Sequence, residues 1–168
     1  MSFSIYQASA PVFVQGLSAL IGVLDKASAH AAARKIDQQA ILQARLFPDM
    51  LPFVRQVQIC GDFAKGAAGR LAGAELPTYE DGETSFEALK ARLEKTIAFI
   101  KGLDPAAFEG AEDRDITLVR RGESSVHKGS AYLLEQALPN YYFHLTTAYD
   151  LLRHNGVEIG KKDFLGVA

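Results

Sequence analysis

Apolar residues recur at helical spacing in the first third of the chain. From residue 11 onward they follow one another three or four positions apart, as expected for one face of an amphipathic helix. They are Phe13, Leu17, Leu20, Ile21 and Leu24. Ser9 can cap the N-terminus of this helix, and Pro11 is tolerated in its first turn. The pattern predicts a first helix from about residue 11 to residue 30.

A second apolar helix follows an irregular segment. Residues 31–47 have little periodicity apart from a short helix that Asp37 can cap, and we interpret them as a long crossover connection. The second helix is predicted to begin with Asp49 as its cap and Pro52 in its first turn, and to run to Leu71. Gly73 is the predicted stop.

A capping motif predicts the start of the third helix. A loop rich in glycine, proline and acidic residues spans 73–83 and lacks apolar periodicity, which indicates an exposed loop. In the next segment, Thr84-Ser-Phe-Glu87, the Thr84 hydroxyl and the Glu87 carboxylate can form a capping box. One apolar stripe then follows, and Gly102 marks its end. The stripe consists of Phe86, Leu89, Leu93, Ile97 and Ile100.

The last third of the chain combines a hairpin with a fourth helix. Residues 115–119 alternate polar and apolar side chains, Gly122 suits a turn, and residues 124–128 can form the return strand. The last helix is predicted to begin near Ser130, to bend at Pro139 and to stop at Asn155-Gly156. The fold class is therefore all-α: one domain over residues 1–168, a four-helix bundle with a long crossover after the first helix and a small β-hairpin between the third and fourth helices.

Composition narrows the function classes. The 168 residues are 48% hydrophobic and 23% charged, with a net charge of −2, so there is no overall basic field to attract nucleic acid or an anionic membrane. No stretch was expected to reach the roughly 20 apolar residues that span a bilayer, which favours a cytoplasmic location. Cys60 is the only cysteine, which excludes an internal disulfide and a multi-cysteine zinc site.

Four segments carry a family resemblance. Residues 46–58, 62–66, 138–144 and 152–156 are similar to a bacterial subfamily of unknown function within the DinB-like superfamily of four-helix bundles. The resemblance implies a homodimer. In relatives with the full site it implies a divalent metal held by three histidines, one from the second helix and two from the fourth, and in some of them transfer of a low-molecular-weight thiol. Here His144 matches one histidine of the pair, Asn140 replaces the other, and the second helix has none.

These departures define the candidate site. Asn140 and His144 stand at i and i+4, so they lie on one helix face. Gln58, Asp62 and Lys65 lie along one face of the second helix, which can be a pocket wall or simply a solvated face. Two interpretations stay open for His144, Asn140, Asp62 and Gln58: a polar network within the bundle, with Asp62 accepting from His144, or a mixed metal site. Imidazole suits zinc or nickel, whereas an amide carbonyl suits harder ions such as manganese.

Three functions follow from these interpretations. The first is a bundle that binds a small molecule in a polar pocket and has no certain cofactor. The second is a divergent transferase or hydrolase that depends on zinc, nickel or manganese. The third is a dimeric interaction bundle without catalysis. The other polar residues are expected to be peripheral, with His30 and His127 at the surface.

Overall fold

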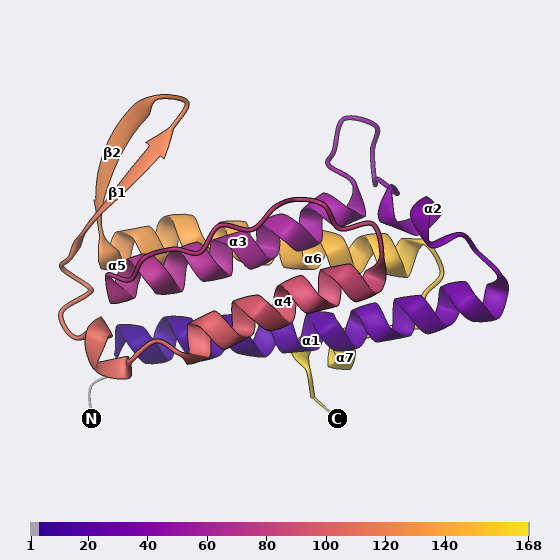
Figure 1. The fold of residues 1–168 in the computed structure, drawn as a ribbon, viewed down its shortest axis with the longest axis horizontal. Coiled ribbons are helices and arrows are strands. Elements are labelled where there is room, and N and C mark those ends of the chain that lie inside the picture. The colour runs from indigo at the N-terminus through magenta and orange to yellow at the C-terminus, as the bar shows by residue number, and fades with distance from the viewer. Residues whose placement is uncertain (1–3, 168) are drawn as a thin grey trace.

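The structure is a computed structural model that describes residues 4–167 (Figure 1). Four long helices form the bundle: α1 (Ile5–Arg34), α3 (Phe53–Ala72), α4 (Phe86–Lys101) and α6 (Leu138–His154). The antiparallel hairpin of β1 (Asp115–Arg120) and β2 (Glu123–Lys128) lies between α4 and α6. The predicted all-α bundle with a small hairpin is confirmed. The shorter elements are α2 (Gln38–Leu42), η1 (Pro105–Phe108), α5 (Gly129–Ala131), η2 (Tyr132–Ala137) and α7 (Lys161–Leu165).

Contacts between the helices fix their directions. The Tyr141 hydroxyl donates to the Phe13 carbonyl at 3.1 Å, and Gly156 lies beside His30, so α1 and α6 are parallel. On α3 and α4, Phe53 pairs with Phe86 and Asp62 with Arg92, so these two helices are also parallel. A parallel pair of consecutive helices needs a connection that returns along the length of the bundle.

That connection is residues 73–85, which run back along α3 and α4 (Figure 1). The long connection expected after the first helix exists, from residue 35 to residue 52, and it contains α2 with Asp37 as its cap. However, it turns at one end of the bundle rather than crossing it, because α1 and α3 are antiparallel. The segment that the sequence indicated only as an exposed loop is therefore the one that crosses the bundle.

Several helix ends differ from the predicted ones. Helix α1 begins earlier than expected, because Ser4 and Gln7 form a capping box, while the predicted cap Ser9 bonds back to a carbonyl inside the helix. Pro52, rather than Asp49, is the N-cap of α3. Ser85, rather than Thr84, caps α4, with its hydroxyl accepting from the Ala88 N–H at 3.0 Å. The glycine stops at Gly73 and Gly102 are confirmed.

The expected irregularity near Pro139 takes the form of a π-helical segment. Six residues, Tyr132–Ala137, adopt π-helical geometry directly before α6, in which Pro139 is in the first turn. Proline lacks the N–H that would continue the α-helical pattern and its ring crowds the carbonyl four residues earlier. The wider π turn accommodates this conflict, and it also places Tyr132 over α3.

Two features of α1 correct the sequence expectations. Its length and a mean hydropathy of 1.4 over an 18-residue window make it apolar enough to cross a membrane, contrary to the expectation that no segment is. The buried core helix of a globular bundle can have the same length and hydropathy. Helix α1 buries one face against α4, α6 and α7. His30 is half-buried rather than at the surface, and its Nε2 atom is buried with no hydrogen-bond partner among the described residues.

Candidate functional site

His144 is held by an amide from α3. Its Nδ1 atom lies 2.7 Å from Oε1 of Gln56, whose own Nε2 donates to the Leu51 carbonyl at 3.1 Å. Because the amide nitrogen is committed as a donor, Oε1 accepts, and Nδ1 of His144 carries the proton. Burial lowers the pKa of His144 below its usual value of 6.5. The imidazole is therefore neutral at pH 7, with a lone pair on Nε2.

Two aromatic rings contact the same imidazole. The Phe63 ring stacks on it with the centroids 5.8 Å apart and an interplanar angle of 17°, and the Phe143 ring meets it edge-on at 5.1 Å. Stacking and edge contacts of this kind fix a ring orientation. Gln56 and Phe63 both belong to α3, so this helix sets the position and the tautomer of His144.

Asn140 does not join His144 in a shared hydrogen bond. Its Nδ2 atom donates to the Gln136 carbonyl at 2.6 Å, one turn earlier in the same helical segment. The predicted bond between His144 and Asp62 is also not among the contacts of the described residues, since Gln56 takes that place. The i, i+4 spacing on α6 is real, but the two side chains have separate partners.

Asp62 and Gln58 belong to a second polar group, centred on Arg92 of α4. Both oxygens of Asp62 lie 3.2 Å from Nη2 of Arg92, and one lies 3.1 Å from Nζ of Lys65. Gln58 donates to Glu83 and accepts from Arg55 at 2.7 Å. Gln58 and Asp62 therefore share a network, but His144 is not one of its members.

We call this group the Arg92 network. The Arg92 side chain is 3% exposed and also pairs with Asp81 and Glu83, each at 3.0 Å. Burial by itself would lower the pKa of Arg92, but the bond to Glu83 and the charges of the carboxylates raise it above its ordinary value. The guanidinium lies over the Tyr79 ring at 5.5 Å. The network consists of the cations Arg55, Lys65 and Arg92 and the carboxylates Asp62, Asp81 and Glu83.

The donor set does not fit a divalent metal. No group of three or more histidine, cysteine, aspartate or glutamate side chains in residues 4–167 could hold a metal ion. Among the described residues nothing bonds Nε2 of His144, and its Nδ1–H is oriented, as in metal-binding histidines. However, Asp62 is held by two cations and Asn140 faces its own helix. The described side chains therefore do not assemble a divalent-metal site around His144.

A cavity of about 230 Å³ lies beside Asp62 and Phe63. We call it the hairpin pocket, because β1 forms one wall and α3 and η2 form the others. Apolar and aromatic side chains predominate, and the charged groups are Asp62 and Arg70. It is lined by Ile59, Asp62, Phe63, Arg70, Leu118, Val119 and Tyr132.

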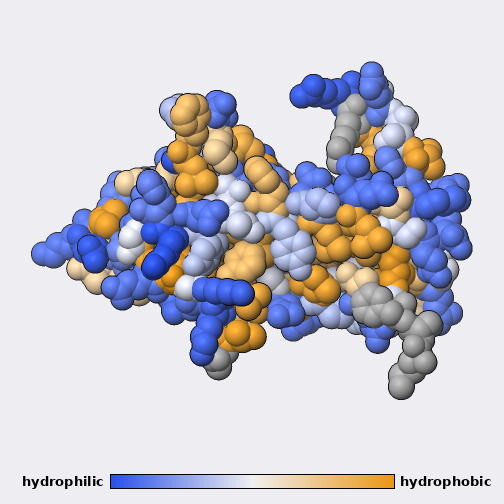
Figure 2. All heavy atoms as spheres, turned by 180° about the vertical axis from the view of Figure 1, so that it is seen from behind, coloured by the Kyte–Doolittle hydropathy of each residue, from blue (hydrophilic) through white to orange (hydrophobic). Residues whose placement is uncertain are grey.

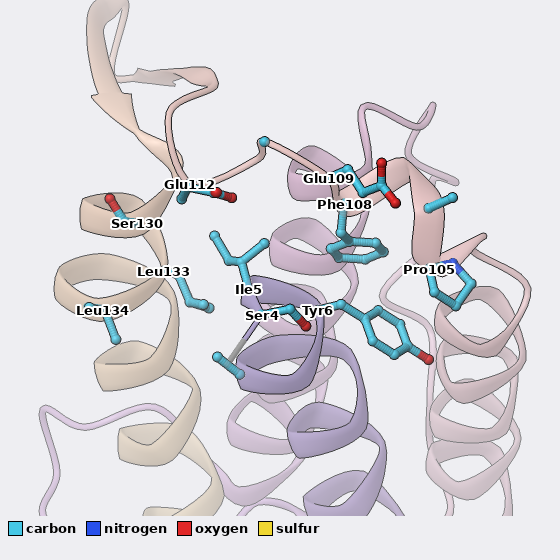
Figure 3. A pocket seen from close by; sticks show the side chains of 13 residues that line it. Ser4, Ile5, Tyr6, Pro105, Phe108, Glu109, Glu112, Ser130, Leu133 and Leu134 are labelled. Carbon is cyan, nitrogen blue, oxygen red and sulfur yellow. The ribbon is translucent and has the colours of Figure 1, made fainter. Parts of the chain in front are cut away.

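A larger cavity of about 700 Å³ lies at the end of the bundle where α1 begins (Figure 3). We call it the end pocket. Tyr6 and Phe108 form an edge-to-face pair in its wall, 5.2 Å between centroids. Its carboxylates are Glu109 and Glu112, and no basic side chain lines it among the described residues. None of the predicted site residues reaches this cavity.

Sequence reasoning missed three residues of these sites. Gln56 is not among the candidate residues that the sequence pattern singled out. Arg92 has a visible signal, because it interrupts the apolar stripe of the third helix between Leu89 and Leu93 and must be buried with them. Arg70 carries no such signal, since a basic residue in the last turn of a helix is ordinary.

The fold places this chain in the class of DinB-like four-helix bundles. A crystal structure of a DinB family member protein from Shewanella denitrificans is 38% identical, with a TM-score of 0.91, and the match covers 98% of this chain and 93% of that one. A family model described as "Domain of unknown function (DUF1993)" matches residues 5–165. The chain belongs to the DUF1993 family. No curated protein matches it.

The surface facing away from the viewer in Figure 1 carries apolar side chains across its middle (Figure 2). Large exposed apolar residues of the chain include Phe47, Leu51, Tyr142 and Phe143. A surface of this kind suits contact with another protein. The homodimer, the cytoplasmic location and the absence of nucleic-acid partners stay predictions.

Proposed function

We propose that this protein binds a small organic molecule in the hairpin pocket, and that it does so without a divalent metal. The observation that carries the proposal is the pocket itself: a cavity with mostly apolar walls and two charged groups, one of which is the candidate residue Asp62. Apolar walls with a few oriented polar groups are the usual composition of small-molecule sites.

The polar neighbours of the pocket support binding rather than metal chemistry. A metal at Asp62 would compete with Arg92 and Lys65, which already neutralise this carboxylate. The alternative of a divergent metal-dependent transferase or hydrolase needs further donors around Nε2 of His144. The described residues offer His144 an amide and two phenyl rings instead.

Phe63 connects the pocket to His144. Its ring lines the cavity and also stacks on the imidazole. The hydrogen bond from His144 to Gln56 therefore helps to hold one wall of the pocket in place, since a fixed imidazole restricts the ring against it. A pre-ordered wall reduces the entropy that a ligand must remove on binding.

The hairpin offers a matched pair of variants for the test. Val119 lines the pocket and is 70% exposed, whereas Val126 is 61% exposed on the neighbouring strand and does not line it. Because both side chains are exposed, tryptophan at either position should leave the fold intact. We expect Val119→Trp to abolish binding of small ring compounds detected by ligand-observed NMR, and Val126→Trp to leave it unchanged.

Calorimetry with Zn²⁺, Ni²⁺ and Mn²⁺ tests the metal alternative on the same preparations. Binding of about one metal per chain that is lost in His144→Ala would contradict the proposal. So would an absence of any pocket ligand, or equal binding by the two tryptophan variants.

A further inference from the structure

We propose that Arg70 makes the hairpin pocket selective for small carboxylates. This inference rests on the proposed function, because it names the class of molecule that the same pocket accepts. It concerns one guanidinium, at the end of α3, whose charge the fold leaves available.

Arg70 has no carboxylate partner among residues 4–167. Within the described part of the chain, no acidic side chain forms an ion pair with it, and its hydrogen bond runs from Nη1 to the Tyr132 hydroxyl at 3.3 Å. Asp62 lines the same pocket, but among the described residues its ion pairs are with other cations than Arg70. Its charge is already matched by Lys65 and Arg92. The uncompensated charge of the pocket is therefore positive.

The guanidinium is positioned rather than extended into solvent. A Cβ atom built on Gly66 would collide with Nη1 of Arg70, one turn earlier on α3. The side chain therefore folds back over Gly66, away from the carbonyls at the helix end. Glycine inside a helix is less stable than alanine by roughly 0.5–1 kcal/mol, and at this position its missing side chain gives the guanidinium its place.

The tyrosine on η2 completes the arrangement. Tyr132 is 3% exposed and comes from the π-helical segment, so the turn forced before Pro139 brings a phenol against Arg70. A phenol oxygen can accept from the guanidinium without neutralising it. Arg70 thus keeps its full charge and several donors beside apolar walls.

The chemistry of this arrangement favours a carboxylate. A guanidinium presents paired N–H donors that match the two oxygens of a carboxylate. A dianionic phosphate would require more cationic groups than Arg70, the one unpaired cation among the described residues that line the pocket. The cavity is also smaller than the roughly 300–1,000 Å³ typical of drug-sized ligands. The class we infer is therefore a single carboxylate on one ring or on a short branched chain.

Paired ligands of equal shape provide the test. Benzoate and benzamide differ in charge and hardly in size, so titration of each into the 15N-labelled protein separates charge recognition from shape. We expect benzoate to shift the amide signals of Phe63 and Arg70 and to bind at least tenfold more tightly than benzamide. A tenfold difference corresponds to about 1.4 kcal/mol, within the range for hydrogen bonds to charged groups.

Three variants locate the effect. Arg70→Gln should weaken benzoate binding at least tenfold and leave benzamide binding unchanged, while Arg70→Lys should lose part of the affinity. Gly66→Ala keeps every charge but displaces the guanidinium, so it should also weaken benzoate selectively. Glu112→Gln in the end pocket is the matched control and should change neither ligand. Thermal unfolding of each variant verifies that the fold is intact.

The outcomes distinguish this inference from the proposed function. Equal affinity for benzoate and benzamide, or benzoate binding that survives both Arg70→Gln and Gly66→Ala, would overturn carboxylate selectivity and leave small-molecule binding standing. Failure of every compound to bind would overturn both. A response to Glu112→Gln instead of Arg70→Gln would move the site to the end pocket and overturn the inference.

Discussion

Two arginines of this protein stand in opposite environments. Arg92 is almost completely buried, and the carboxylates of Asp62, Asp81 and Glu83 surround it. Arg70 lies at a pocket with only a phenol as its side-chain partner among the described residues. A buried charge needs partners, so the first arginine is explained by the fold. The second is not, and its charge is left for a ligand.

The Arg92 network explains how the crossing segment is attached. Residues 73–85 lack apolar periodicity, so they cannot bury a continuous face against α3 and α4. Instead, Asp81, Glu83 and the Glu80 carbonyl bind Arg92, and the Tyr79 ring lies over Lys65 at 4.1 Å. Polar contacts therefore supply much of the attachment, and Arg92 takes part in most of them.

Replacing Arg92 should give the largest effect. Arg92→Met leaves three carboxylates facing one another without their shared cation, and we expect a loss of about 3–5 kcal/mol in the free energy of unfolding, as for other broken buried ion pairs. Urea unfolding measures it. The matched variant Arg70→Met should change stability by less than about 1 kcal/mol, as surface substitutions do. Equal losses would mean that both arginines are structural.

Replacement of two of the carboxylates should then lower the free energy of unfolding in the order of their burial. The Glu83 side chain is 12% exposed and accepts from both Arg92 and Gln58, whereas Asp62 is 40% exposed. We expect Glu83→Gln to lower stability by about 1–3 kcal/mol, since it weakens buried bonds to a charged group. Asp62→Asn should lower it by less than about 1 kcal/mol, because solvent screens an exposed pair. The reverse order in urea unfolding would place the centre of the network on α3.

Gly66→Ala should raise stability while it weakens ligand binding. The added methyl group meets only the end of the flexible Arg70 side chain, which can move at little energy. Alanine in place of helical glycine then contributes roughly 0.5–1 kcal/mol. Thermal unfolding and benzoate titration of the same variant measure both effects. A destabilised variant would show that the guanidinium has a structural role over Gly66.

The sequence predicted the features that local patterns encode, and it did not predict those that depend on contacts between helices. Helix stripes and glycine stops are local, so the bundle, the ends at Gly73 and Gly102 and the hairpin could be predicted. The direction of α4 could not, because only contacts such as Phe53 with Phe86 reveal that it runs parallel to α3. The true crossing segment was therefore interpreted as a simple loop.

The candidate site shows the same limit at the level of single side chains. Asp62, Gln58, Asn140 and His144 were all identified as polar residues within apolar helices. Which of them share hydrogen bonds was not predictable, because the partner of a side chain depends on which residues of the neighbouring helix lie opposite it. Gln56, two residues from Gln58, faces α6, while Gln58 faces the Arg92 network. A two-residue step on a helix reverses the direction of a side chain, and no local pattern tells which helix neighbour it will meet.

The smallest effect concerns a third polar group, His144, whose charged form the fold disfavours. Burial lowers its pKa below 6.5, so at acid pH the unfolded chain binds a proton more readily than the folded one. Stability contributed by the neutral form is therefore present above pH 6.5 and is lost as the pH falls from 6.5 through the lower folded pKa. His144→Gln removes this titration, and urea unfolding between pH 5 and 8 should show a flatter profile for the variant.

Because the imidazole also supports Phe63 in the hairpin pocket, benzoate binding by the wild-type protein should weaken over the same pH interval. A wild-type profile as flat as that of the variant would mean that the His144 charge is tolerated, as the charge of Arg70 is.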